Sequence, residues 1–200
     1  MAGSQNEPKQ ERAWRTRAHI LQVAAELFAE RGYATVTLQD VAERASMTKG
    51  AVYFHYKNKE ALAVAVVHEH YVRWPLLLQD VAARELPPYE TLVTVLDRVA
   101  EAFRDDIVVQ AGARLQIERS LIDADLPEPY VGWEEYLTGF VKEIEKDGGL
   151  RPGVTARGAA RVIVAAFFGM QHISDVLSRR ADLAERYGEL RYVVLEGLCA

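Results

Sequence analysis

The stretch TLQDVAERASMTKGAVYFHY, residues 37–56, decides the fold class of this chain. Thr37 can cap a short helix, with Asp40 three residues later in the position of a capping box. Inside that helix the apolar residues recur at helical spacing, at Leu38, Val41, Ala42 and Ala45. Thr48 then precedes a second short helix over residues 49–55. Two short helices joined by a tight turn predict a helix-turn-helix.

The second of these helices is too short, and its apolar face too small, to form a core helix by itself. Within two turns it presents the small, polar and aromatic side chains that a DNA-reading helix requires, namely Lys49, Gly50, Ala51, Tyr53 and His55. Thr37 and Thr48 stand at helix N-termini, where a hydroxyl and free N–H groups suit a phosphate. This stretch therefore predicts a surface that contacts DNA.

Helical spacing of apolar residues continues on both sides of this stretch, and alternating strand patterns are absent. Upstream, the helix that carries residues 20–28 is expected to stop at Gly32. Downstream, helices are expected after Asn58, after Pro87, near 107–121, over 131–146, from Thr155 to about 177 and over 183–198. Pro75 is expected to kink or end the first of these. The expected fold class is all-α.

Composition narrows the class of protein. Half of the 200 residues are apolar and 26% are charged, which is typical of a folded, soluble chain. No apolar run approaches the ~18 residues of a membrane span, and the polar start lacks the apolar segment of a secretory signal. The single cysteine, Cys199, excludes an intrachain disulfide and a cysteine metal cluster. We expect a cytoplasmic protein with no metal, no cofactor and no membrane partner.

The net charge of −5 argues against a nucleic-acid partner until it is divided along the chain. Residues 1–60 carry nine Lys/Arg and seven Asp/Glu, whereas residues 61–200 carry fifteen and twenty-two. Residues 44–59 hold four basic residues and no acidic one. The positive charge therefore gathers on the predicted helix-turn-helix.

Residues 15–62, RTRAHILQVAAELFAERGYATVTLQDVAERASMTKGAVYFHYKNKEAL, resemble the N-terminal domain of TetR-family repressors. The matching elements are A-x-x-L-F-x-x-x-G-Y, T-x-x-x-V-A, T-K-G-x-x-Y-x-H-Y and K-x-x-L. Ser46 departs from the pattern, since the family usually has Gly in this turn, where positive φ is common. The resemblance implies an all-α homodimer with a mobile arm (1–11), a DNA-binding domain (12–57) and a ligand-binding and dimerisation domain (58–200).

The same resemblance assigns roles to single residues. DNA contacts are expected from Thr48, Lys49, Gly50, Ala51, Tyr53 and His55, and phosphate contacts from Thr37, Tyr56 and Lys59. Lys49 is the best candidate for a base edge, and Tyr53 for a phosphate or a thymine methyl group. The alternative for the aromatic residues is a place in the core, which is expected for Phe54 and stays open for Tyr56.

A narrower resemblance covers residues 112–137, which are similar to the γ-butyrolactone-type receptors of actinomycetes. Those receptors repress antibiotic or morphological genes until a butanolide, butenolide or furan-type signal binds, and their Trp on this helix lines the pocket. Here the pattern is Pro129-Tyr130 followed by Trp133. Alignment places Val164 and Phe167 on the pocket side of the next-to-last helix. Since that family often has a small or hydroxyl residue at position 167, the alternative is an orphan receptor for another apolar molecule, or for none.

The residues themselves indicate the chemistry of an inducer. A pocket should be mostly apolar with a few polar groups, for which His70, Gln116 and Thr138 are the candidates. Each has the alternative of a hydrogen-bonded core or surface residue, and Trp133 has the alternative of plain core. Because residues 61–200 are acidic, a neutral, partly apolar effector is expected rather than an anion.

The last two helices are expected to form a dimer interface. The helix from Thr155 is apolar on nearly all sides, so it needs contacts on two of them. On the final helix Tyr192, Val193, Leu195 and Leu198 would add to the interface. The alternative is that all of these residues belong to the core of one chain.

Two other functions compete with a ligand-responsive repressor. Catalysis is not expected, because His68 and His70 point to different helix faces, and His172, Ser174 and Asp175 diverge along one helix. A ligandless DNA-binding protein would fill its cavity with Trp133, Phe167 and Phe168. For a repressor, our hypothesis is that ligand entry beside Trp133 tilts the helix after Asn58, so that the DNA-reading helices no longer match the major grooves.

Overall fold

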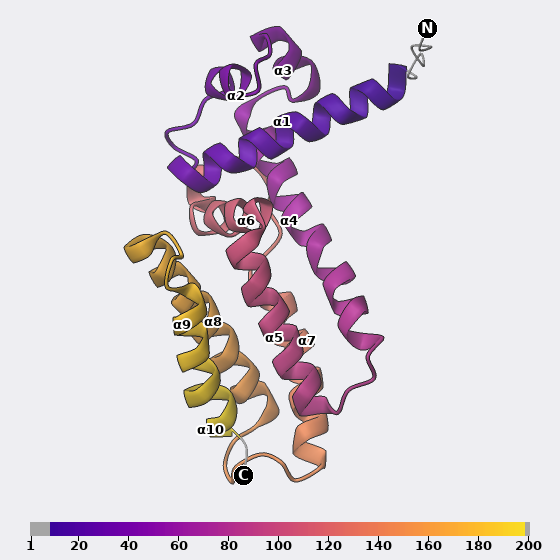
Figure 1. The fold of residues 1–200 in the computed structure, drawn as a ribbon, viewed down its shortest axis with the longest axis vertical. Helices are drawn as coiled ribbons and strands as arrows, with labels where there is room; N and C mark the ends of the chain where they lie inside the picture. Colours follow the sequence, from indigo (N-terminus) through magenta and orange to yellow (C-terminus); the bar gives the residue numbers. More distant parts are fainter. Residues whose placement is uncertain (1–8, 199–200) are drawn as a thin grey trace, which may run out of the picture. The chain divides into compact units, whose positions relative to one another are not determined.

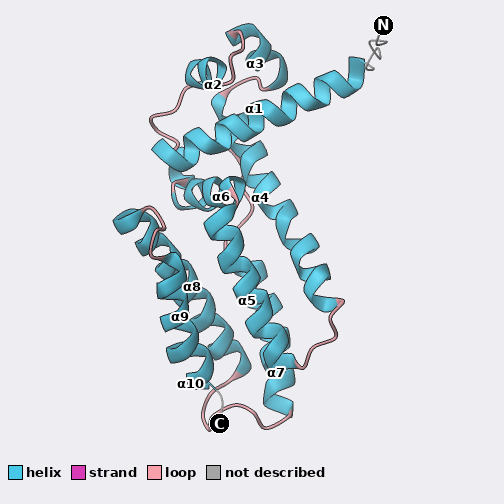
Figure 2. Ribbon diagram, viewed as in Figure 1, coloured by secondary structure: helices cyan, strands magenta, loops and turns pink. Residues whose placement is uncertain are grey.

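The structure, a computed structural model, describes residues 9–198, which contain helices and loops and no β-strand (Figures 1 and 2). The α-helices are α1 (Lys9–Arg31), α2 (Leu38–Arg44), α3 (Lys49–His55), α4 (Lys59–Ala82), α5 (Pro88–Asp105), α6 (Ile107–Ile117), α7 (Val131–Lys146), α8 (Ala156–Ser178), α9 (Leu183–Leu190) and α10 (Glu196–Leu198). A 3-10 turn, η1, covers Arg119–Leu121, and a π-helical turn, η2, covers Arg191–Leu195. The expected all-α class is confirmed.

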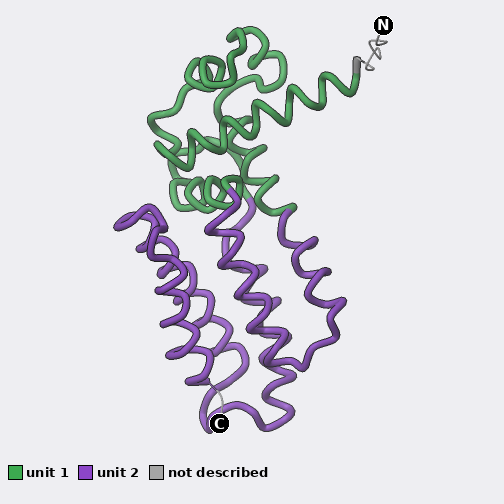
Figure 3. The backbone as a smooth tube through the Cα atoms, in the orientation of Figure 1, with its two compact units in different colours: residues 1–72, 107–126 green, residues 73–106, 127–200 purple. Residues whose placement is uncertain are grey.

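The chain forms two compact units (Figure 3). Unit 1 comprises residues 1–72 and 107–126, and unit 2 comprises residues 73–106 and 127–200. Helix α4 is continuous and contributes to both units. Residues 9–11, expected in a mobile arm, are helical, while the rest of that arm (1–8) and Cys199 lie outside the described residues.

Unit 1 encloses its core with helices α1, α2, α3, the first half of α4, and α6. The largest of its fully buried side chains come from α1, α4 and α6, and include Ile20, Leu27, Phe28, Leu62 and Leu115. Helix α1 ends at Gly32, whose φ is +78°, as the sequence predicts. Arg114 of α6 donates to the Ala29 carbonyl at 2.9 Å, and the Glu118 carboxylate accepts from the Tyr33 N–H. Helix α6 is thereby fixed to the C-terminal end of α1.

Unit 2 is a bundle of four main helices, α5, α7, α8 and α9, together with the last turns of α4. Its core side chains come from apolar stripes that the sequence predicts, such as Leu92, Leu96, Val99 and Phe103 on α5. Helix α4 does not end at Pro75 but continues to Ala82. Trp74 and Val81 on either side of the proline are buried, and this packing offsets the backbone hydrogen bond that proline removes.

Ser46 adopts the left-handed conformation that the family pattern suggests, with φ of +54°. A residue with a Cβ is strained there, whereas glycine is not. We expect Ser46→Gly to raise the free energy of unfolding by about 0.5 to 1 kcal/mol, because relief of strain exceeds the entropy that glycine adds to the unfolded chain. Chemical denaturation measures the change. Ser46→Ala is the control, and an equal gain from it would show that backbone strain is not the cause.

Candidate functional site

Helices α2 and α3 each begin at a threonine cap. The hydroxyl of Thr37 accepts from the Asp40 N–H at 3.2 Å, and the Asp40 carboxylate accepts from the Thr37 N–H at 2.7 Å, so the predicted capping box is present. These hydrogen bonds, the one from the Thr37 hydroxyl foremost, lower the pKa of the Asp40 carboxyl. The hydroxyl of Thr48 accepts from the Ala51 N–H at 3.2 Å. The two caps fix the first residues of α2 and α3.

Helix α3 turns one side inward and leaves the opposite side open. Val52 is fully buried, whereas Lys49, Gly50 and Tyr53 are exposed and His55 is half-buried. The Lys49 ammonium lies 5.6 Å from the centre of the Tyr53 ring. A Cβ added to Gly50 would meet nothing within 4 Å, so the backbone there is open to a close approach. This side offers a cation, an aromatic edge and bare backbone within two turns.

The structure contradicts the core position expected for Phe54 and decides the open alternatives for Tyr56 in favour of the core. Phe54, expected in the core, is 81% exposed. Tyr56, expected at a phosphate, is 3% exposed, and its buried hydroxyl has no hydrogen-bond partner. Burial raises the pKa of this hydroxyl. Because Val52 and Tyr56 are four residues apart they share the inward side, and Phe54, midway between them, must face solvent.

Lys59 and Thr37 lie at the start of α4 and α2, as the sequence predicts, yet both already have partners within the protein. The Lys59 ammonium donates to the Tyr33 carbonyl at 3.0 Å and lies 4.0 Å from the centre of the Tyr33 ring. Thr37 shares its helix start with the Asp40 carboxylate, whose negative charge opposes a phosphate. Phosphate contacts by Thr37 and Lys59 stay predictions.

The basic segment 44–59 keeps most of its positive charge at the surface. Arg44 pairs with Glu30 at 3.2 Å, and both side chains are about half exposed. Such an exposed pair contributes little to stability. Lys49 and Lys57 are exposed without an acidic residue in the segment, so the surface around α3 stays positive.

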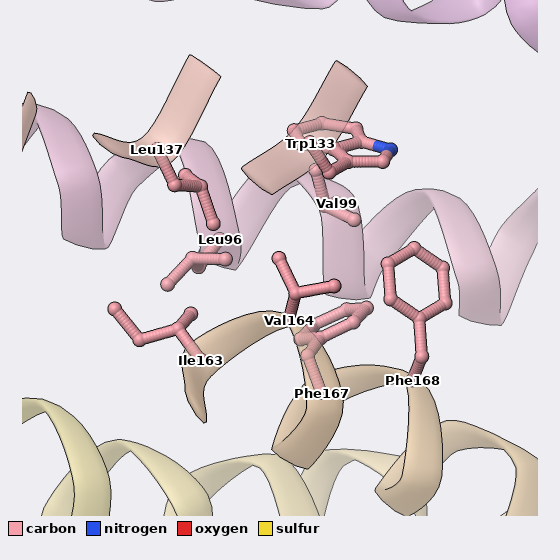
Figure 4. Close-up of a pocket in the computed structure, with 8 residues that line it drawn as sticks. All are labelled: Leu96, Val99, Trp133, Leu137, Ile163, Val164, Phe167 and Phe168. Atoms are coloured by element: carbon pink, nitrogen blue, oxygen red, sulfur yellow. The ribbon is translucent and has the colours of Figure 1, made fainter. Parts of the chain in front are cut away.

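A cavity lies within unit 2, between α5, α7 and α8 (Figure 4). The side chains that line it are all apolar: Leu96, Val99, Trp133, Leu137, Ile163, Val164, Phe167 and Phe168. It holds about 10 Å³ of free space, room for about one water molecule. The two phenylalanines and Trp133 fill the interior that a ligand would need.

Three of the residues predicted for a pocket, Trp133, Val164 and Phe167, line this cavity together. His70, Gln116 and Thr138 do not line it. His70 is 5% exposed in unit 1, where its Nδ1 lies 3.1 Å from the Val109 carbonyl oxygen, and Thr138 donates to the Glu134 carbonyl of its own helix at 2.6 Å. Gln116 is buried in unit 1 and donates to the Tyr71 hydroxyl at 3.1 Å.

Helix α4 meets the cavity wall through an aromatic chain. The Trp133 ring packs edge-on against Trp74 of α4, with 5.3 Å between ring centroids, and Trp74 stacks on Phe103 at 6.1 Å. Phe103 in turn contacts Phe167 at 5.7 Å. Trp74 of α4 is therefore in direct contact with Trp133 and is connected to Phe167 through Phe103.

A second aromatic contact joins the loop before α7 to the cavity wall. Tyr130 has φ of +71°, a strained value for a residue with a Cβ, and its ring lies 4.7 Å from that of Phe168. Burial raises the pKa of the Tyr130 hydroxyl. The Pro129-Tyr130 pattern of the sequence thus places an aromatic ring against a residue of the cavity wall.

Helices α8 and α9 leave large apolar side chains exposed. On α8 these are Val162, Ile173, Val176 and Leu177, and next to α9 they are Tyr192 and Val193, the last two about 70% exposed. Leu195, expected at the same interface, is fully buried in its own chain. By length and composition α8 could cross a membrane, the one such helix among residues 9–198. Its inner side, however, packs against α7 and α9 and lines the cavity.

The described residues give little support for a metal site or for a catalytic group. Between residues 9 and 198 no three His, Cys, Asp or Glu side chains are grouped so that they could hold a metal ion. His172, Ser174 and Asp175 lie on α8, and the Ser174 hydroxyl donates to Asp182 at 2.5 Å. That serine is thereby committed to the connection between α8 and α9.

The chain is similar to known regulators and receptors. The profile of "Bacterial regulatory proteins, tetR family" matches residues 20–66. The "A-factor receptor protein" of Streptomyces griseus is 32% identical over 182 residues, which are 91% of this chain and 63% of that protein. The chain therefore spans less than two thirds of the length of this relative.

Two solved structures have the same fold over nearly their whole length. One, reported as "Molecular basis for control of antibiotic production by a bacterial hormones", is 54% identical, with a TM-score of 0.83, and the match covers 93% of this chain and 98% of the other. The other, a "gamma-butyrolactone receptor (ArpA like protein)", is 28% identical with a TM-score of 0.80, covering 94% and 90%.

Proposed function

Since this chain belongs to the tetR family of bacterial regulatory proteins, we propose that it is a ligand-responsive transcriptional repressor that binds a palindromic operator as a homodimer. It acts in the cytoplasm, on double-stranded DNA, and it has no catalytic activity. The observation that carries this proposal is the open side of α3, where Lys49, Gly50 and Tyr53 stand free of the core on a helix capped by Thr48. The direct test is a gel shift on the DNA upstream of its own gene.

The DNA contacts come from the first turns of α3. Lys49 reads a base edge, Tyr53 contacts a phosphate or a thymine methyl, and Thr48, Ala51 and His55 line the approach. Gly50 lets the backbone come close to the DNA. Tyr56 supports this surface from within the core rather than by touching a phosphate.

The dimer forms through the exposed apolar sides of α8 and α9. Four exposed apolar residues on α8 and two beside α9 leave apolar surface in contact with water, and a second copy of the same surface covers it. The symmetry of such a dimer places two α3 helices about one DNA turn apart, roughly 34–36 Å. Sedimentation should therefore give twice the mass of one chain.

The inducer is a neutral, largely apolar small molecule of the butanolide or butenolide class. The all-apolar lining of the cavity supports this class, and two relatives, an A-factor receptor and a gamma-butyrolactone receptor, point the same way. A butanolide exceeds the free space of about 10 Å³, so Phe167 or Trp133 must move when it enters.

The closed cavity favours one alternative. A protein of the same family that keeps Phe167 in place would bind DNA and answer to another apolar molecule, or to none. Thermal melts with butyrolactones and butenolides separate the two functions, because a ligand of the native state raises the melting temperature with its concentration.

Induction works through α4. Ligand entry displaces Trp133, and its contact with Trp74 transmits the displacement to α4, whose first half packs in the core of unit 1. The ligand can shift the equilibrium between the two conformations of the repressor only to the extent that it binds the conformation with low DNA affinity more tightly than the other.

We expect Trp133→Ala to give a repressor that binds its operator with unchanged affinity and is not released by the inducer, because the contact with Trp74 is lost. Phe140→Ala on the same helix, outside the cavity lining, is the matched control and should release normally. Fluorescence anisotropy of a labelled operator, titrated with lactone, measures release. Normal release of the Trp133→Ala complex would mean that induction does not pass through this cavity.

A further inference from the structure

The N-terminal part of α1 carries surface that the core of unit 1 does not use. Among residues 10–19 every residue except Thr16 is exposed, and the first fully buried residue of the helix is Ile20. Ten residues of α-helix extend about 15 Å. Figure 1 shows this part of α1 continuing past α3 toward the N-terminal end. A helix segment of this length with so little buried surface is not explained by the stability of the fold.

The composition of this overhang, defined as residues 10–19, is unusual for a solvated helix. It holds three arginines, Arg12, Arg15 and Arg17, against a single acid, Glu11. It also exposes 64% of Trp14, the most apolar large side chain of the segment. Arginine and exposed tryptophan together are typical of a binding surface and not of a helix face that only meets water.

The position of Arg17 connects the overhang with the proposed DNA-reading helix. Its guanidinium lies 4.8 Å from the centre of the Tyr56 ring, and Tyr56 is the residue that ends α3. Trp14 is three residues before Arg17, so it lies one turn further along the same side of α1. The arginines therefore continue the positive surface of α3 beyond the end of that helix.

We propose that the overhang is a second DNA contact, which binds the phosphate backbone beside the half-site read by α3. Arg12 and Arg15 bind phosphate oxygens, and Trp14 packs on the sugar-phosphate chain and donates its indole N–H to a phosphate. This inference rests on the proposed function, because it places the overhang on the operator. It lengthens the contacted DNA on both sides of the palindrome, and it adds affinity without adding sequence preference.

The test uses the full chain and duplexes selected from a random pool by the wild-type protein. Arg12→Gln/Arg15→Gln removes both cations and keeps good helix-forming residues, and Arg98→Gln/Arg104→Gln on α5 removes the same charge from exposed sites in unit 2. Equal thermal melts show that the variants are folded. The readouts are the slope of log K against log salt and the hydroxyl-radical footprint.

The overhang variant should show a salt slope smaller by about 3.6, which is about 0.9 for each of two arginines in each of two protomers. Its footprint should retract at both outer ends, while the α5 variant behaves as wild type. Trp14→Phe should weaken binding less than Trp14→Ala, since it loses only the indole donor. A wild-type slope and footprint in the overhang variant would overturn the inference and leave the repressor intact. Failure of the wild type to select any duplex would overturn the proposed function, and this inference with it.

Discussion

Lys49→Ala is expected to reduce operator affinity by a factor on the order of 30 to 10,000, since a good base contact contributes about 1–3 kcal/mol and a dimer has two. Lys49 is exposed at the first position of α3 and contacts no acidic residue of its segment. Its removal should change the free energy of unfolding by less than about 0.5 kcal/mol. Ligand binding in unit 2 should stay as in the wild type. Anisotropy titrations at fixed salt measure the loss.

Lys57→Ala is the matched control for charge. Lys57 lies in the same basic segment and is exposed, but it follows α3 instead of standing on it. Lys57→Ala should weaken binding modestly and to the same extent for all DNA sequences, because it removes only the salt-dependent attraction to phosphate. Lys49→Ala, in contrast, should also relax the preference for one base pair. Equal effects of the two substitutions would mean that Lys49 is only a phosphate contact.

Phe167→Ala is expected to lower the free energy of unfolding by about 3–5 kcal/mol, the usual cost of deleting a buried phenyl ring. Phe167 is 2% exposed, and its ring packs against three others, at 5.7 Å from Phe103, 5.7 Å from Phe168 and 6.1 Å from Tyr187. The cavity of unit 2 already has little free space, so the deleted ring leaves a new apolar void. Urea denaturation measures the loss.

The void should also bind apolar molecules that the wild type excludes. Benzene or indole should raise the melting temperature of Phe167→Ala and leave the wild type unchanged, because an apolar cavity of this kind stays dry until such a molecule enters. Phe167→Leu is the control, with a smaller loss of stability and little binding. A Phe167→Ala protein as stable as the wild type would mean that the helices around the cavity collapse onto the space.

Local chemistry made the helix boundaries predictable. The capping box of Thr37 and Asp40, the cap by Thr48, and the helix stop at Gly32 depend on neighbours within a few residues, and all are present. Pro75 does not end α4, because the helix around it is buried by partners that are distant in sequence. Trp74 next to it packs against Phe103 and Trp133. Phe54 was wrongly expected in the core, and Tyr56 stayed open, because a helix of two turns does not reveal which side faces inward.

The cavity was only partly predictable for the same reason. Trp133, Val164 and Phe167 came from a family pattern, whereas Leu96, Leu137 and Ile163 line the cavity because three apolar stripes meet there. The sequence shows each apolar stripe, but it does not show which other stripe it packs against. His70 was predicted to be a polar contact of a ligand, but its ring lies beside the Val109 carbonyl. His70 packs so closely on α6 that a Cβ added to Gly112 would lie 2.3 Å from the Cβ of His70.

The most direct test of the repressor is one titration with two steps. A labelled duplex from the DNA upstream of the gene is saturated with protein, and a panel of butyrolactones and butenolides is then added while anisotropy is recorded. We predict that two protomers bind each palindrome and that at least one lactone returns the anisotropy to that of free DNA. A duplex that stays unbound at low salt, or a complex that persists while a lactone raises the melting temperature of the protein, would contradict a ligand-released repressor.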